Sequence, residues 1–350
     1  MKSICFFNNK GGVGKTTLVC NVASYLATKF QLNVLLIDAD PQCNATQLVA
    51  TDKQIQEFYR ERTRRRVKRD PTSTSVDTIF DVLGPIAAGD PDIAQELHPL
   101  RSSKNDFRVD LLPGHPQMSL LEDRLSQAWL LFVGGELGSA RVTNWNTQLL
   151  HLVHDRYDLV FFDVGPSLGA LNRSVLIGAD MFVTPLGCDI FSLLGVTNIA
   201  QWLKEWLESY EQALTKVQQK WDIDEYEVRT ETTSIARFIG YTVQQYITKA
   251  KAGVRRATKA YEQILKRTPK TVKDALGPFT AEHLGSDDLR LPDVPHMYSL
   301  VPLAQNAKVP IHLVESRHGM AGAQYLQKEQ YVTFIHELAG AVRDNAGLGE

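Results

Sequence analysis

Short apolar runs alternate along the chain with longer segments in which apolar residues recur at the spacing of a helix. The short runs predict strands at 2–7, 33–38, 108–113, 157–163, 180–185, 236–243 and 297–302. The longer segments predict helices at 116–131, 143–154, 169–178, 190–220, 250–267 and 321–344, with a further helix directly after residue 17. Strands that are apolar almost throughout and that alternate with helices are typical of a doubly wound α/β fold, in which helices flank both faces of a mainly parallel sheet.

Two less regular stretches interrupt this alternation. Residues 51–75 are polar and rich in arginine, and residues 268–296 contain repeated prolines and glycines, which break helices. A length of 350 residues suits one large α/β domain or two average ones. We expect a single domain over residues 1–350, with surface elaborations near 51–75 and 250–296.

A glycine-rich loop at residues 8–17 separates the first predicted strand from the helix that follows it. In loops of this kind the backbone N–H groups surround phosphates, the last lysine reaches the β and γ oxygens, and the following hydroxyl binds Mg²⁺. A helix that begins at such a loop adds a dipole that favours anions. We therefore expect an ATP phosphate site here, and a glycine turn without a nucleotide is the alternative. Its binding residues would be Gly11, Gly12, Val13, Gly14, Lys15, Thr16 and Thr17.

Carboxylates follow two of the predicted strands. Asp38 ends the run at 33–38 and Asp163 ends the run at 157–163. The carboxyl ends of parallel strands meet at one edge of a sheet, where ligands bind. Mg²⁺ prefers oxygen ligands and keeps several waters. The sequence thus predicts Thr16, Asp38 and Asp163 as the residues that hold Mg²⁺.

The loop carries a second lysine, Lys10, where the general phosphate loop begins with glycine. The run Lys-Gly-Gly-Val-Gly-Lys-Thr-Thr resembles the deviant Walker A motif of the ParA/Soj and MinD ATPases, which are P-loop NTPases of the SIMIBI class. Residues 38–46 resemble the switch I of that family, and residues 161–169 resemble its Walker B strand and switch II. Two positions depart from the family pattern, because Cys43 stands where glycine is frequent and Gly165 stands where proline is common.

The resemblance implies roles for individual residues. Lys10 is expected to reach the nucleotide of a second copy of the chain in an ATP-gated sandwich dimer, and Asp40 is expected to orient the attacking water. The implied catalytic residues are Lys10, Lys15 and Asp40. Gly165 is expected to offer its backbone N–H to the γ-phosphate, because glycine tolerates unusual backbone angles. Pro302 is expected to contact the adenine base.

The formal net charge of −2 conceals two strongly basic segments, since residues 60–69 carry +6 and residues 249–273 carry +8. Such clusters predict an anionic partner, and a basic helix face near 249–267 would hold DNA phosphates without reading the bases. The expected DNA contacts are Arg255, Arg256, Lys259, Lys266, Arg267, Arg64, Arg65 and Arg66. A solvated helix face is the alternative for 249–267. For 60–69 the alternatives are contact with an acidic partner protein and a mobile segment without a partner.

The leading functional hypothesis is a Mg²⁺-dependent ParA-type ATPase that partitions or positions DNA. It would convert ATP to ADP and phosphate slowly, respond to a ParB-like or other activating partner, and work as a cytoplasmic homodimer associated with the nucleoid. The alternatives are an ATP-gated regulatory subunit that controls a partner effector, and a MinD-like ATPase that binds membranes. Membrane binding is less favoured because the C-terminal segment is not polybasic. Four scattered cysteines argue against a metal-cluster protein.

Overall fold

A six-stranded sheet forms the centre of the computed structural model, which describes residues 1–65, 75–244, 248–251, 254–257 and 259–349. The strand order is β3-β2-β4-β1-β5-β6, and every neighbouring pair is parallel. The strands are β1 (Lys2–Phe6), β2 (Val34–Asp38), β3 (Asp110–Leu112), β4 (Leu159–Asp163), β5 (Met181–Gly187) and β6 (Arg237–Gln244). The predicted doubly wound α/β fold is confirmed.

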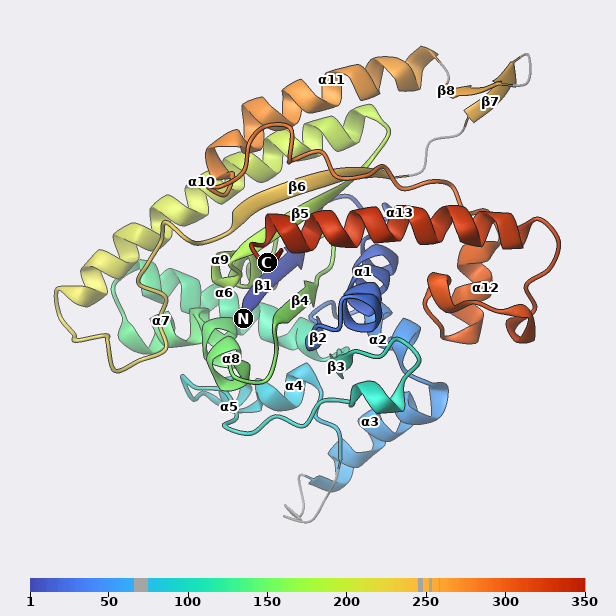
Figure 1. Cartoon of the computed structure of the whole chain (residues 1–350). Helices are drawn as coiled ribbons and strands as arrows, with labels where there is room; N and C mark the ends of the chain where they lie inside the picture. The colour runs from blue at the N-terminus through green and yellow to red at the C-terminus, as the bar shows by residue number, and fades with distance from the viewer. Residues whose placement is uncertain (66–74, 245–247, 252–253, 258, 350) are drawn as a thin grey trace.

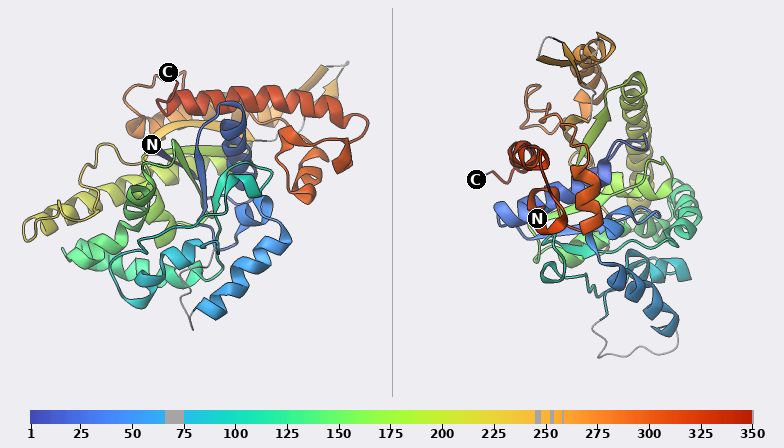
Figure 2. Two further views of the ribbon diagram at one scale, coloured as in Figure 1. Left: turned by 60° about the horizontal axis from the view of Figure 1, so that its bottom comes forward. Right: turned by 90° about the vertical axis from the view of Figure 1, so that its right-hand side faces the viewer.

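Helices cover both faces of this sheet, as the right-hand view of Figure 2 shows. The α-helices are α1 (Lys15–Lys29), α2 (Asn44–Val49), α3 (Asp52–Arg65), α4 (Ile79–Val82), α5 (Gly84–Ala88), α6 (Met118–Val133), α7 (Leu137–Thr143), α8 (Trp145–Val153), α9 (Ala170–Gly178), α10 (Ile190–Gln218), α11 (Lys259–Leu276), α12 (Leu300–Ala307) and α13 (Gln324–Asn345). Short 3-10 turns lie at Ser102–Lys104, Gly277–Phe279, Ile311–Leu313 and Ser316–His318.

Alternate side chains of each strand enter opposite cores. Ile4 and Phe6 of β1 join the core beneath α1 and α13, whereas Cys5 joins the core beneath α6, α9 and α10.

Two predicted elements are wrong. The run at 297–302 is not a strand, because helix α12 begins at Leu300. Leu300 and Ala304, four residues apart, are its buried residues, and a short apolar run cannot distinguish this spacing from that of a strand. The helix expected at 250–267 is instead an antiparallel pair, β7 (Thr248–Lys251) and β8 (Val254–Ala257), followed by α11.

Helix α11 also continues through Pro269, which the sequence analysis treated as a helix breaker. Proline removes one backbone donor from a helix and favours a kink. In α11 the Thr268 hydroxyl donates to the carbonyl oxygen of Ile264 at 2.9 Å, and Thr268 and Val272 are buried on either side of the proline. Helix α11 thus remains continuous where it packs against α10.

The outer edge of β6 is covered by residues 280–294, which belong to the stretch 268–296 that is rich in proline and glycine. Isolated parallel bridges join Phe238 to Thr280, Tyr241 to Arg290 and Gln244 to Val294. Such cover removes the exposed row of backbone groups that makes an edge strand prone to aggregation. Residues 280–294 therefore complete the sheet rather than form a separate projection.

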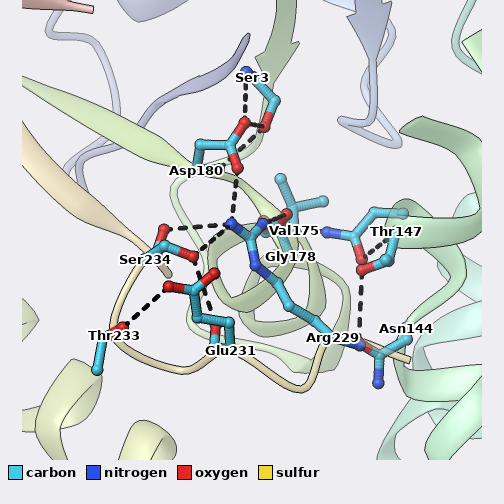
Figure 3. A network of polar contacts seen from close by, with 11 residues as sticks. Ser3, Asn144, Thr147, Val175, Gly178, Asp180, Arg229, Glu231, Thr233 and Ser234 are labelled. Carbon is cyan, nitrogen blue, oxygen red and sulfur yellow. Dashed lines mark hydrogen bonds and ion pairs between the residues drawn. The ribbon is translucent and has the colours of Figure 1, made fainter. Parts of the chain in front are cut away.

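Arg229 ties together the amino-terminal ends of three strands (Figure 3). Its guanidinium donates to the Gly178 carbonyl at 2.8 Å, to the Asp180 carboxylate at 2.7 Å and to the Ser234 carbonyl at 3.2 Å. Asp180 in turn accepts from the backbone N–H and the hydroxyl of Ser3 in β1. Because these contacts lie at the starts of β1, β5 and β6, the opposite, carboxyl-terminal edge remains available for a ligand.

Candidate nucleotide-binding site

The glycine-rich loop joins β1 to α1 and requires glycine at two positions. Gly12 has φ 75° and Gly14 has φ 74°, both in the left-handed region that residues with a side chain disfavour. A Cβ atom at Gly14 would also lie 2.5 Å from Oε1 of Gln244. Gly14 is the N-cap residue of α1 without a side-chain cap, so the first N–H groups of this helix stay available for an anion.

Lys15 begins α1 and is held over the loop. Its side chain is buried, and Nζ donates to the backbone carbonyl of Lys10 at 3.2 Å. Burial lowers the pKa of Lys15, while the nearby Asp163 and Asp40 carboxylates oppose this shift. The ammonium group is thus placed to meet phosphate oxygens at the amino end of α1.

Asp38 and Asp163 lie side by side on neighbouring strands, because the register of β2 and β4 pairs them directly. Neither side chain has any solvent exposure. Oδ2 of Asp38 accepts from the N–H and the hydroxyl of Thr46 at 2.7 Å each, whereas within the described part of the chain both oxygens of Asp163 lack a hydrogen-bond partner. Sequence reasoning placed these carboxylates together, and the structure brings them together.

Burial raises the pKa of both carboxyl groups. The pKa of Asp38 rises to about 7, because burial outweighs the hydrogen bonds from Thr46. The pKa of Asp163 rises well above its ordinary value through burial and through repulsion by Asp38, while Thr16 and Lys15 act in the opposite direction. Two such acids at one point indicate that a positive charge is needed there.

A hydrated Mg²⁺ ion fits this arrangement. The unpartnered oxygens of Asp163 could accept from water bound to the ion, as a buried carboxylate requires a partner. Among the described residues no group of three or more His, Cys, Asp or Glu side chains could hold a metal. An ion at this edge would therefore take most of its oxygen ligands from phosphate, water and the Thr16 hydroxyl.

The switch I segment places Asp40 against the loop after β4. Asp40 is buried, and its Oδ1 accepts from the N–H of Gln42 at 2.9 Å. A Cβ atom on Gly165 would lie 3.2 Å from the same oxygen. Gly165 is absent from the residues with positive φ, so its φ does not require glycine. The contact of its backbone N–H with the γ-phosphate stays a prediction. What matters is the missing side chain, which leaves room for Asp40.

Cys43 occupies a backbone conformation that favours glycine. Its φ is 56° and it precedes α2 as the N-cap residue. A residue with a Cβ atom in this region costs about 1 kcal/mol relative to glycine. Glycine is frequent at this position in the ParA/Soj and MinD ATPases, and it suits the left-handed conformation. The present chain adopts the same conformation with cysteine.

A cavity of about 670 Å³ opens over the phosphate loop. Its lining includes Gly11 to Thr17, Asp40, Gln42, Asn44, Gln47, Leu48, Asp52, Val164, Pro166, Gln305, Asn306 and Lys308. Pro302 lies exposed in α12 and is not among the lining residues, so its contact with a base stays a prediction. Gln305, Asn306 and Lys308 line the cavity although the sequence did not single them out. They lie in the stretch 304–310, which resembles the adenine-side loop of the ParA/Soj and MinD ATPases.

Lys10 is not among the residues that line this cavity. Its Nζ lies 2.5 Å from Oδ2 of Asp189, the residue before α10. The other oxygen of Asp189 accepts from the N–H groups of Phe191 and Ser192 and so caps α10. Although burial opposes ionisation of Asp189, the hydrogen bonds from Lys10 and Ser192 lower its pKa.

Comparison with known proteins decides the family. A family model described as an AAA domain matches residues 1–216. The virulence plasmid ParA family protein pGP5-D of Chlamydia psittaci is 29% identical over 201 residues, and the chromosome partitioning protein ParA of Caulobacter vibrioides is 30% identical over 202 residues. Each match covers 57% of this chain, and 62% and 61% of those proteins. The chain belongs to the ParA/Soj-like P-loop ATPases.

Solved structures resemble the whole ParA-like chain. Protein DIP2308 from Corynebacterium diphtheriae is 31% identical, with a TM-score of 0.73 and full coverage of both chains. The structure of pNOB8 ParA bound to nonspecific DNA is 18% identical and covers 100% of this chain and 99% of that one, with a TM-score of 0.55. At that identity the likeness shows the fold alone.

The predicted DNA contacts of this ParA-like chain fall into two groups. Arg255 and Arg256 lie in β8 and Lys259 begins α11, where Lys266 and Arg267 are exposed. Arg64 and Arg65 end α3, and Arg66 lies outside the described residues. Figures 1 and 2 place α3 and the β7–β8 pair at opposite ends of the molecule, so the two groups do not form one surface.

Proposed function

We propose that the protein is a Mg²⁺-dependent ATPase that hydrolyses ATP to ADP and phosphate and uses ATP to control its dimerisation. The observation that carries this proposal is the Asp38–Asp163 pair beside the phosphate loop, because both carboxyl groups are fully buried and lie directly opposite each other on neighbouring strands. Backbone N–H groups and Lys15 would hold the phosphates, while Thr16, Asp38 and Asp163 would hold Mg²⁺. The ion would neutralise charge on the transferred phosphoryl group.

Asp40 would orient the water for in-line attack. The water oxygen then bonds to the γ-phosphorus while the bond to the ADP oxygen breaks. Asp40 supports this role because it lines the cavity and lies against Gly165. Phosphoryl transfer depends mainly on such positioning and on charge neutralisation.

Lys10 would complete the site of a second copy of the chain. Lys10 does not line the cavity of its own chain, and its ammonium group forms a partly exposed ion pair with Asp189. If the Lys10 side chain contacted the nucleotide bound by the second copy, its positive charge would lie beside the phosphates, as the charge of an arginine finger does. Hydrolysis would then require the ATP-bound sandwich dimer, at a slow rate that a ParB-like partner increases.

The ATP-bound dimer would hold DNA without sequence preference, for partition or positioning of DNA in the nucleoid. The exposed Lys266 and Arg267 of α11 and the basic residues of β8 support this proposal, because grouped cations bind phosphates. No helix among the described residues has both the length and the apolarity for crossing a bilayer. A regulatory subunit whose ATP-dependent dimer controls a partner effector is the second candidate, favoured by the separation of α3 from α11 (Figure 1).

The test measures binding of a fluorescent 40-base-pair duplex of arbitrary sequence by anisotropy, with ATP, with ADP and without nucleotide, over a salt series. We expect binding only with ATP and Mg²⁺, with affinity that falls steeply as salt rises. Lys15→Ala is the control, since it should remove the effect of ATP. DNA binding that ignores the nucleotide would contradict the switch, and no binding in any state would favour the regulatory subunit.

A further inference from the structure

The loop after β4 is held by a side chain from the helix that follows it. Nδ2 of Asn172 donates to the carbonyl oxygen of Gly165 at 2.8 Å and to the carbonyl oxygen of Ser167 at 2.7 Å, and it lies 3.2 Å from the Ser167 hydroxyl. Asn172 is 1% exposed and lies in the first turn of α9. A single buried carboxamide thus holds the backbone carbonyls of the two residues on either side of Pro166.

Helix α9 is itself fixed at its amino end. Glu122 of α6 accepts from the N–H of Leu171 at 3.1 Å and also from the N–H of Ala170. A Cβ atom on Gly169 would overlap the Glu122 carboxylate, so glycine is required for this approach. The carboxylate satisfies two unpaired N–H groups of the helix and favours its positive end. Asn172 is therefore attached to a rigid element.

The other side of the loop lies next to the residue proposed to orient water. A Cβ atom on Gly165 would lie 3.2 to 3.4 Å from the carboxylate atoms of Asp40. The space beside the Asp40 carboxylate is therefore bounded by the backbone of residue 165. A change in the position of Gly165 would change the space that is available to Asp40.

We propose that Asn172 is a positioning residue, which holds the 165–167 loop at the distance from Asp40 that hydrolysis requires. The inference rests on the proposed ATPase function and names a residue that acts through the loop. A proline at residue 165 would stiffen the loop through its ring, whereas this chain has Gly165 and supplies the constraint from α9. Gly165 and Asn172 are consequently coupled, although seven positions separate them in sequence.

The test compares Asn172→Asp with wild type. The carboxylate has the shape of the carboxamide but cannot donate to two carbonyls, so the loop should loosen. We expect kcat for ATP to fall about tenfold while the Kd for ATP stays within about twofold, because only the positioning of water is lost. Amide hydrogen exchange in peptides that span 164–170 should become faster, which provides a readout that does not depend on turnover.

Asn105→Asp is the matched control. Nδ2 of Asn105 also donates to two carbonyls, of Arg101 at 3.2 Å and Val109 at 2.8 Å, and the residue is buried but does not line the cavity. It should keep the wild-type kcat and the wild-type exchange at 164–170. If Asn172→Asp fails to fold, Asn172→Ser replaces it and should lower kcat in the same way, because a hydroxyl can donate to only one carbonyl at a time.

The outcomes separate the inference from the function on which it rests. A wild-type protein that does not hydrolyse ATP contradicts the proposed function. Wild-type turnover together with an unchanged kcat in the folded Asn172 variant contradicts only the positioning role. An equal loss of kcat in Asn105→Asp, or a tenfold weaker Kd for ATP in Asn172→Asp, also contradicts it, since either would indicate general destabilisation.

Discussion

The ammonium group of Lys10 forms an ion pair with the carboxylate of Asp189 in the same chain, with 2.5 Å between Nζ and Oδ2. Both side chains are about one third exposed, so water weakens the pair. If Lys10 serves the nucleotide of a second copy, this pair must open before the dimer forms. Opening the Lys10–Asp189 pair then costs free energy, and dimerisation is weaker by that amount.

Asp189→Asn should strengthen ATP-dependent dimerisation. Asparagine caps a helix about as well as aspartate, so α10 keeps its first turn while Lys10 loses its ionic partner. We expect the dimer Kd to fall about two- to fivefold, as for an exposed ion pair, measured by sedimentation with a non-hydrolysable ATP analogue. Asp274→Asn, which removes the exposed pair with Lys270, should leave the Kd unchanged. Weaker dimerisation of Asp189→Asn would show that Asp189 supports the dimer.

The two lysines of the loop should have separable roles. Lys15→Ala should abolish ATP binding, because the buried ammonium group at the start of α1 is lost. Lys10→Ala should retain much of the binding but lose ATP-dependent dimerisation and turnover. Calorimetry for binding, sedimentation for dimerisation and phosphate release for turnover give the comparison. Unchanged turnover in Lys10→Ala would reject the sandwich dimer.

Asp163→Asn should make the metal-free protein more stable relative to wild type as pH rises. The folded state holds the Asp163 proton to higher pH than the unfolded chain, whose pKa is near 3.8. Above that pH, ionisation of wild type costs folded-state stability, by at most about 1.4 kcal/mol per pH unit for this group. Asparagine has no such cost.

The measurement is denaturant unfolding with a chelator at pH 5 and at pH 7.5. The stability difference between Asp163→Asn and wild type should grow in favour of the variant between these two values. The exposed Asp155→Asn should follow wild type. Addition of Mg²⁺ and ATP should stabilise wild type but not Asp163→Asn. A stability difference that does not change between pH 5 and pH 7.5 would contradict a raised pKa of Asp163 in the folded protein.

Replacement of Lys266 and Arg267 by alanine should weaken DNA binding by the ATP-bound protein. Both side chains are exposed on α11. Loss of two phosphate contacts should reduce the slope of log affinity against log salt by about 2. The control replaces Lys104 and Lys220, which are also exposed but lie outside α11. An equal effect of both double variants would attribute binding to overall charge rather than to α11.

Local patterns were sufficient for the sheet and for the phosphate loop. Buried parallel strands are apolar throughout, and a glycine-rich turn between a strand and a helix requires the left-handed angles found at Gly12 and Gly14. Asp38 and Asp163 could be placed together because both end parallel strands. By contrast, local pattern did not distinguish strand from helix at 297–302, and it missed the β7–β8 pair.

The sequence by itself determined the fold class, the phosphate loop and the acidic edge beside it, since each depends on neighbours in the chain or on the ends of parallel strands. Only the tertiary structure decided what surrounds them. Asn172 holds the loop after β4, Asp189 binds Lys10, and Gln305 reaches the cavity from α12. These contacts join residues whose separation is set by how helices pack on the sheet, and no short-range pattern encodes that packing.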